Sequence, residues 1–77
     1  MTWREAVETA VRRYASKCDA GIFSRQDFLA EEENRIISDC GGGGETPRQT
    51  ISRVLQELRN DGVIDFLDDR GTYRLIP

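Results

Sequence analysis

The chain has 77 residues and a formal net charge of −3, with 11 lysines and arginines against 14 aspartates and glutamates. A chain of this length forms one small domain, predicted over residues 1–77, and leaves no room for a large enzyme pocket. No apolar run approaches the roughly 20 residues of a membrane span, so we expect a cytoplasmic protein without a membrane partner.

The two cysteines exclude most metal chemistry, because the sequence contains no histidine and Cys18 lies far from Cys40. A zinc site with four Cys or His ligands cannot form within one such chain. We therefore predict no metal and no other cofactor. We expect two free thiols in a reducing compartment, with a Cys18–Cys40 disulfide as the alternative.

The first predicted element is a helix over residues 2–19, which Gly21 is expected to close. Thr2 and Glu5 stand at the spacing of a capping box. Apolar residues then recur at helical spacing and predict a buried stripe: Trp3, Ala6, Val7, Ala10, Val11, Tyr14, Ala15 and Cys18. The outer side is basic and is either solvated or in contact with phosphates: Arg4, Arg12, Arg13 and Lys17.

The next segment predicts a short strand and a second helix. Ile22 and Phe23 form an apolar pair that can add a third strand to a later hairpin. Ser24 is a good N-cap, and Asp27 in the first turn suits the helix dipole. The buried candidates of this helix are Phe28, Leu29, Ile36, Ile37 and Cys40.

The end of the second helix is open, because the acidic residues 31–33 either continue the helix or break it. The helical spacing of Leu29, Ile36 and Cys40 favours continuation to about Asp39. The glycines at 41–44 then predict a flexible connector. A phosphate-binding loop would need Gly-Lys-Ser/Thr after them, which this chain lacks, so no nucleotide site is expected.

A third helix is predicted from residue 47 to residue 60. Thr46 is a suitable N-cap, Pro47 suits the first helical position, and Gln49 can complete a capping box. Gly62 is predicted to end the helix with a positive φ. The apolar stripe comprises Ile51, Val54, Leu55 and Leu58.

A β-hairpin follows, with predicted strands over residues 63–67 and 72–76 and a turn over residues 68–71. Alternation predicts that Ile64, Phe66, Tyr73 and Leu75 point inward. It also predicts that Asp65, Thr72 and Arg74 point outward.

The polar face of the third helix is the candidate site. It carries side chains that can hydrogen-bond base edges and phosphates: Arg48, Gln49, Ser52, Arg53 and Gln56. Residues 46–60 carry three arginines and one glutamate, so this segment is locally basic. On the hairpin, Arg70 and Arg74 either contact phosphate or pair with Asp68 and Asp69. The alternative for the whole face is an amphipathic helix whose polar side contacts only water.

Three segments resemble the C-terminal winged-helix domain of the Dam-replacing protein family, which comprises restriction endonucleases. They are residues 46–59 (TPRQTISRVLQELR), 61–67 (DGVIDFL) and 71–75 (GTYRL). The resemblance implies the order helix, short strand, helix, helix, hairpin and the binding of double-stranded DNA. The nuclease domain of that family has no counterpart here, since Lys17 is the only lysine and lies in a helix with a core stripe.

We therefore expect an α+β winged helix-turn-helix with three helices and a small antiparallel sheet. The leading functional hypothesis is a non-enzymatic module that reads double-stranded DNA. It would act as a small transcriptional regulator or as the DNA-reading domain of a larger restriction-modification protein. The alternative is a protein-interaction or dimerisation module, because an acidic surface suits a basic protein partner. A homodimer is a further hypothesis, with the first helix or the Trp3 end as its interface.

Overall fold

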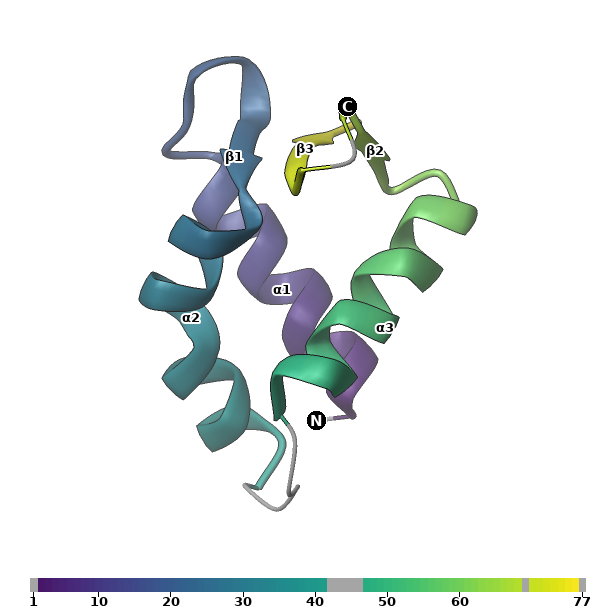
Figure 1. Cartoon of the computed structure of the whole chain (residues 1–77). Coiled ribbons are helices and arrows are strands. Elements are labelled where there is room, and N and C mark those ends of the chain that lie inside the picture. Colours follow the sequence, from purple (N-terminus) through teal and green to yellow (C-terminus); the bar gives the residue numbers. More distant parts are fainter. Residues whose placement is uncertain (1, 42–46, 69, 77) are drawn as a thin grey trace.

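The computed structural model describes residues 2–41, 47–68 and 70–76, and its architecture is α+β. The elements are α1 (Trp3–Ala15), the 3-10 turn η1 (Asp19–Gly21), β1 (Ile22–Ser24), α2 (Arg25–Asp39), α3 (Pro47–Asn60), β2 (Ile64–Phe66) and β3 (Thr72–Leu75). This order confirms the predicted fold class and is compatible with a winged helix-turn-helix (Figure 1).

The sheet has the order β1-β3-β2, and both strand pairs are antiparallel. Tyr73 of β3 lies opposite Phe23 on one side and Phe66 on the other. The Phe23 and Tyr73 rings meet edge-on at 5.7 Å between centroids, and the Phe66 and Tyr73 rings stack at 4.6 Å. The third strand predicted at Ile22 and Phe23 is confirmed and extends to Ser24.

The core lies where α1, α2, α3 and the inner face of the sheet meet. The buried apolar residues are Ala6, Val7, Ala10, Val11, Ala15, Phe23, Phe28, Leu29, Ile36, Ile51, Val54, Leu55, Leu58, Ile64 and Tyr73. The predicted core members Trp3, Tyr14, Cys18, Cys40, Phe66 and Leu75 are only partly buried and pack against this core. Ile37, also expected inside, is half-buried. Both cysteines are free, as expected.

The prediction for the end of the first helix was wrong, because α1 stops at Ala15 and not at Asp19. The N–H groups of Lys17 and Cys18 bond three residues back, to Tyr14 and Ala15. Ala20 and Gly21 then adopt positive φ values of 57° and 70°, which reverse the chain into β1. Cys18 stays partly buried in this turn, so the apolar spacing continued past the true helix end.

The second helix runs to Asp39, which confirms that the acidic run continues it. Ser24 caps this helix, since its hydroxyl oxygen accepts a bond from the Asp27 N–H at 3.1 Å. Gly62 has φ +79° and ends α3, as predicted. The Val63 N–H bonds the Leu58 carbonyl, and the Gly62 N–H bonds the Arg59 carbonyl, which together form a Schellman motif.

Both hairpin strands are shorter than the ranges predicted for them, 63–67 and 72–76. The paired segments are Ile64–Phe66 and Thr72–Leu75. Four of the sequence-based predictions fall outside the described residues: the connector glycines 42–44, the Thr46 cap, its capping box with Gln49, and the pairing of Asp69 with the hairpin arginines.

One carboxylate of the acidic run 31–33 lies in the core, which the sequence analysis did not predict. Glu32 of α2 is 1% exposed. The Arg13 guanidinium of α1 donates to both of its oxygens, from Nε at 2.9 Å and from NH2 at 2.8 Å. This bidentate ion pair links α1 to α2.

Candidate nucleic-acid interface

The helical periodicity that places apolar residues on the inner face of α3 places polar residues on its outer face. Ile51, Val54, Leu55 and Leu58 are buried. On the opposite side Gln49, Arg53 and Gln56 are exposed, and the Arg53 side chain keeps 72% of its surface accessible. These residues are spaced four and three apart, so they form one stripe along the helix.

The two predicted arginines of α3 each lie beside a carboxylate. Nε of Arg48 donates to Glu33 Oε2 of α2 at 2.8 Å, although the Arg48 side chain is 66% exposed. Nε of Arg53 lies 3.7 Å from Glu57 Oε2 one helical turn away. The positive charge of this face is therefore partly compensated within the molecule.

Ser52, the fifth predicted member of this face, is half-buried and bonded within the protein. Its hydroxyl oxygen accepts a 2.6 Å bond from NH2 of Arg25, the first residue of α2. The Arg25 backbone N–H donates to the Gly71 carbonyl at 2.7 Å. Arg25 thus joins α2, α3 and the hairpin turn at one point.

Sequence reasoning missed Arg25, although one signal was present. An arginine in the first turn of a helix is unfavourable beside the positive end of the helix dipole, so it needs a compensating interaction. Here that interaction includes Ser52, which lies 27 residues further along the chain. Glu33 and Arg59 were missed as well.

The hairpin turn is shaped by Asp68. Its Oδ1 accepts the backbone N–H groups of Arg70 at 2.8 Å and Thr72 at 3.2 Å. These bonds hold the pKa of Asp68 below its ordinary value, and the bond from the Arg70 N–H contributes most. Asp68 thus bonds the backbone of the turn, while the second predicted partner, Asp69, lies outside the described residues. The Arg70 side chain is exposed beside this turn.

The structure separates Arg74 from Arg70. Arg74 neighbours Tyr73 on β3 and points to the opposite side of the strand, away from the core. Its NH2 lies 3.8 Å from Asp65 Oδ2 on β2. Arg74 therefore belongs to the outer face of the sheet, whereas Arg70 adjoins the start of α3.

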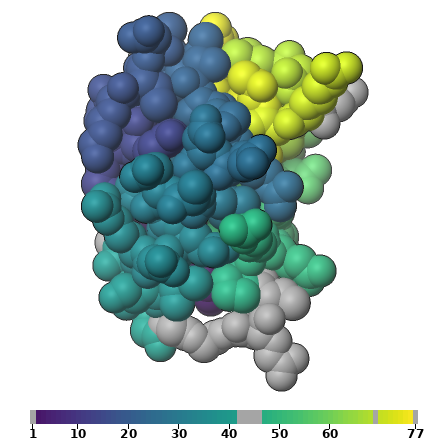
Figure 2. All heavy atoms as spheres, turned by 60° about the vertical axis from the view of Figure 1, so that its left-hand side comes forward, coloured from purple at the N-terminus to yellow at the C-terminus, as the bar shows by residue number. Residues whose placement is uncertain are grey.

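Two shallow depressions flank the hairpin turn, and both include Gly71 and Tyr73. The first is lined by Arg25, Gln26, Leu29, Arg48, Arg70, Gly71 and Tyr73. The second is lined by Gln56, Arg59, Phe66, Asp68, Gly71 and Tyr73. In Figure 2, α2 faces the reader, the first turns of α3 lie beside it in green, and the C-terminal hairpin lies above them in yellow.

Arg59 completes the second depression. Its guanidinium carbon lies 4.9 Å from the centre of the Phe66 ring, whose other neighbour is Tyr73. This cation–π contact fixes a positive charge beside Gln56, between α3 and the sheet. The interface therefore carries arginines along its length, from Arg48 at the start of α3 to Arg59 at its end.

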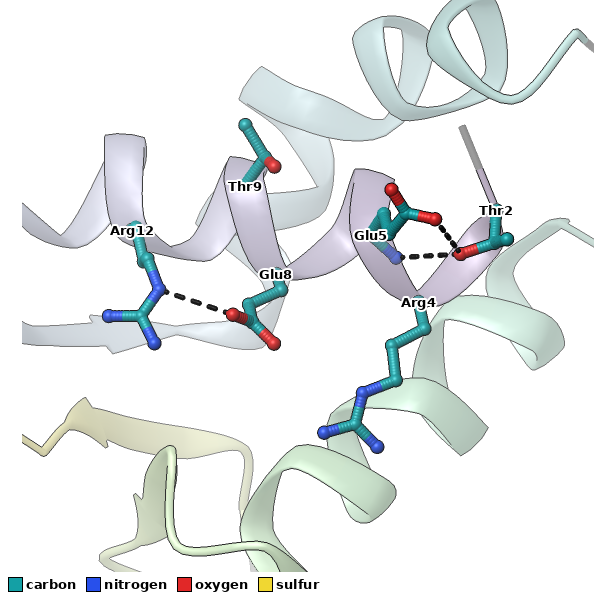
Figure 3. A pocket seen from close by; sticks show the side chains of 6 residues that line it. All are labelled: Thr2, Arg4, Glu5, Glu8, Thr9 and Arg12. Carbon is teal, nitrogen blue, oxygen red and sulfur yellow. Dashed lines mark hydrogen bonds and ion pairs between the residues drawn. The ribbon is translucent and has the colours of Figure 1, made fainter.

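A further depression lies on the outer face of α1, where side chains pair along the helix (Figure 3). It is lined by Thr2, Arg4, Glu5, Glu8, Thr9 and Arg12. The Thr2 hydroxyl accepts the Glu5 N–H and donates to the Glu5 carboxylate, both at 3.1 Å, so the predicted pair does cap the helix.

The arginines of α1 form ion pairs within the protein. Arg12 pairs with Glu8, and Arg4 pairs with Asp61 beyond the end of α3. Arg13 pairs with the buried Glu32. The two alternatives predicted for this side, solvation or contact with phosphates, did not include these ion pairs within the protein.

Within the described part of the chain, no three Cys, Asp or Glu residues are grouped so as to hold a metal ion. None of the helices in that part has the length and apolar character needed to cross a bilayer. Comparisons with protein-family models, with curated proteins and with solved structures found no match to this chain.

Proposed function

We propose that this chain is a non-enzymatic, cytoplasmic module that binds double-stranded DNA, with α3 in the major groove. The observation that supports this most is the exposed stripe of Gln49, Arg53 and Gln56 on α3. A glutamine can bond adenine and an arginine can bond guanine through two atoms each, worth about 1–3 kcal/mol of discrimination.

The length of this stripe limits what one copy reads. Gln49 and Gln56 are seven positions apart, so at 1.5 Å of rise per residue the stripe spans roughly 10 Å, about three base pairs at 3.4 Å. So short a site suits a module that acts as a dimer or within a larger protein. Either a small transcriptional regulator or the reading domain of a restriction-modification protein fits this requirement.

The test is duplex binding by the Arg53→Ala variant, measured by fluorescence anisotropy at about 50 mM salt. Arg53 is exposed and only loosely paired, so its loss should leave the fold intact and lower affinity about tenfold. Arg12→Ala is the matched control, because Arg12 also pairs with a glutamate one turn away but lies on α1. Equal affinities for wild type and Arg53→Ala would refute the groove assignment.

A protein-interaction module is the second candidate, and the outer face of the sheet favours it. Three large apolar side chains are exposed there: Ile22 at 40%, Leu67 at 42% and Ile76 at 37%. Ile22 lies opposite Arg74 on the side of the sheet away from the core. Leu67 and Ile76 follow β2 and β3, and their N–H groups continue the ladder, so alternation places them on the same side. Sedimentation of wild type and Leu67→Ser tests it: a dimer that the substitution dissociates supports this candidate, and a monomer at high concentration opposes it.

A further inference from the structure

We propose that the depression between α2, α3 and the hairpin turn binds one phosphodiester group of the nucleic-acid backbone through Arg25, Arg48 and Arg70. This inference rests on the proposed DNA-binding function and assigns Arg48 to the backbone, leaving base reading to the outer stripe of α3. The three arginines that line this depression come from three elements: α2, α3 and the turn between β2 and β3.

Arg25 is held in place from two sides. Its NH2 donates to Ser52, and its backbone N–H donates to Gly71. Its Nε is buried and lacks a hydrogen-bond partner among the described residues. A buried donor without a partner is costly, so the Arg25 side chain is held here by the surrounding packing and by its bond to Ser52.

Gly71 allows this close assembly. It has φ +91°, and a Cβ atom built on it would lie 3.2 Å from Arg25 Cβ. A larger residue would therefore push the turn, and with it Arg70, away from α2. The glycine keeps Arg70 and Arg25 on the same depression.

The charge around the depression favours an anion. Its described lining contains three arginines and no carboxylate. Two carboxylates adjoin these arginines from outside the lining: Glu33 of α2 pairs with the Arg48 guanidinium, and Asp68 accepts the backbone N–H of Arg70. Guanidinium groups pair with phosphate oxygens in geometry and charge, so a phosphate group suits this depression, and the proposed function makes the backbone phosphodiester its source.

The experiment compares the salt dependence of duplex binding for the single variants Arg25→Gln, Arg48→Gln and Arg70→Gln and for the triple variant. The probe is a labelled duplex of random sequence. Each phosphate contact on B-DNA contributes about −0.9 to the slope of log K against log salt. We expect each single variant to lose about tenfold in affinity at about 50 mM salt.

The triple variant separates one shared phosphate from three separate contacts. With one shared phosphate its slope falls by about 0.9, and the losses of the single variants do not add. A slope lower by about 2.7 means three separate phosphates and overturns the proposal. Arg12→Gln serves as the control and should keep the wild-type slope, while circular dichroism checks that Arg25→Gln stays folded. If Arg25→Gln unfolds, the salt dependence is compared instead between the single variants Arg48→Gln and Arg70→Gln and their double variant.

Failure of the inference and failure of the function are distinguishable. If wild type binds with a steep slope and all variants match it, DNA binding stands and this phosphate site is wrong. If wild type does not bind the duplex, the function itself fails.

A second experiment titrates the protein with inorganic phosphate and monitors the arginine Nε–H signals by NMR. Shifts at Arg25, Arg48 and Arg70 with phosphate, without duplex binding, would indicate a site for free phosphate and overturn the proposal.

Discussion

Glu32 shows at the residue scale how a buried charge is tolerated in a small core. The Arg13 guanidinium satisfies both carboxylate oxygens, and Arg35 NH1 lies 3.6 Å from one of them. The hydrogen bonds from Arg13 hold the pKa of Glu32 below its ordinary value of 4.5, against the opposing effect of burial. Removing one partner of such a pair leaves the other uncompensated.

We predict that Glu32→Gln lowers the free energy of unfolding by about 2 kcal/mol at pH 7. Arg13 is partly exposed and can turn to water, so the cost should lie below that of a fully buried pair. Urea unfolding followed by circular dichroism measures it. Glu31→Gln is the control, since Glu31 is the exposed neighbour and should change stability little.

The same pair predicts a pH dependence. A carboxyl whose pKa is lowered by folding stabilises the native state above its unfolded pKa, and this stabilisation is lost as pH falls through the folded pKa. Wild type should therefore lose stability below about pH 4.5, and Glu32→Gln should lose less. Parallel pH profiles for the two proteins would contradict this account of Glu32.

Gly71 and Gly62 form a second comparison at the residue scale. Both have positive φ, +91° and +79°, but only at Gly71 would a Cβ atom meet another residue within 4 Å. Gly62→Ala should cost about 1 kcal/mol, from the backbone conformation alone. Gly71→Ala should cost more, because Arg25 must also move. Thermal unfolding of the two variants tests this, and equal losses would show that the contact with Arg25 is unimportant.

At the element scale, the interface is defined by how α2 and the hairpin approach α3. Arg25 links α2 to both, and Glu33 of α2 binds Arg48 at the start of α3. The Glu33 carboxylate competes with any phosphate for Arg48. This competition weakens contacts that depend on charge alone, which are the contacts of non-specific binding.

We therefore predict that Glu33→Gln raises the affinity for a random duplex severalfold at about 50 mM salt. In this variant Arg48 can contact a phosphate without first breaking an ion pair with Glu33. The measurement is fluorescence anisotropy, and Glu8→Gln is the matched control because Glu8 pairs with Arg12 on α1. Unchanged or weaker binding by Glu33→Gln would mean that Arg48 does not meet the duplex.

The elements were largely predictable from sequence because their signals are local. Periodicity and caps identified α2, α3 and the hairpin, and apolar character identified β1. The end of α1 was not predictable, because Cys18 continues the apolar spacing from within a turn. The Glu32–Arg13 and Arg25–Ser52 contacts span 19 and 27 residues, and sequence spacing carries no signal over such distances.

At the scale of the whole molecule, charge is distributed unevenly. The net charge is −3, yet the arginines of α3, of the start of α2 and of the hairpin turn adjoin one another. Residues 21–45, which include β1 and α2, carry two arginines against six carboxylates. A duplex should therefore approach through the side of α3 and be repelled elsewhere, which orients the encounter.

Duplex binding at two salt concentrations tests the central claim most directly. Fluorescence anisotropy with a labelled random duplex at about 50 and about 200 mM salt measures it. A protein that contacts several phosphates should lose orders of magnitude in affinity across this range. We predict that loss for wild type and a smaller one for the triple variant Arg25→Gln, Arg48→Gln, Arg70→Gln. No binding of the duplex at 50 mM salt would contradict the account and favour the protein-interaction module.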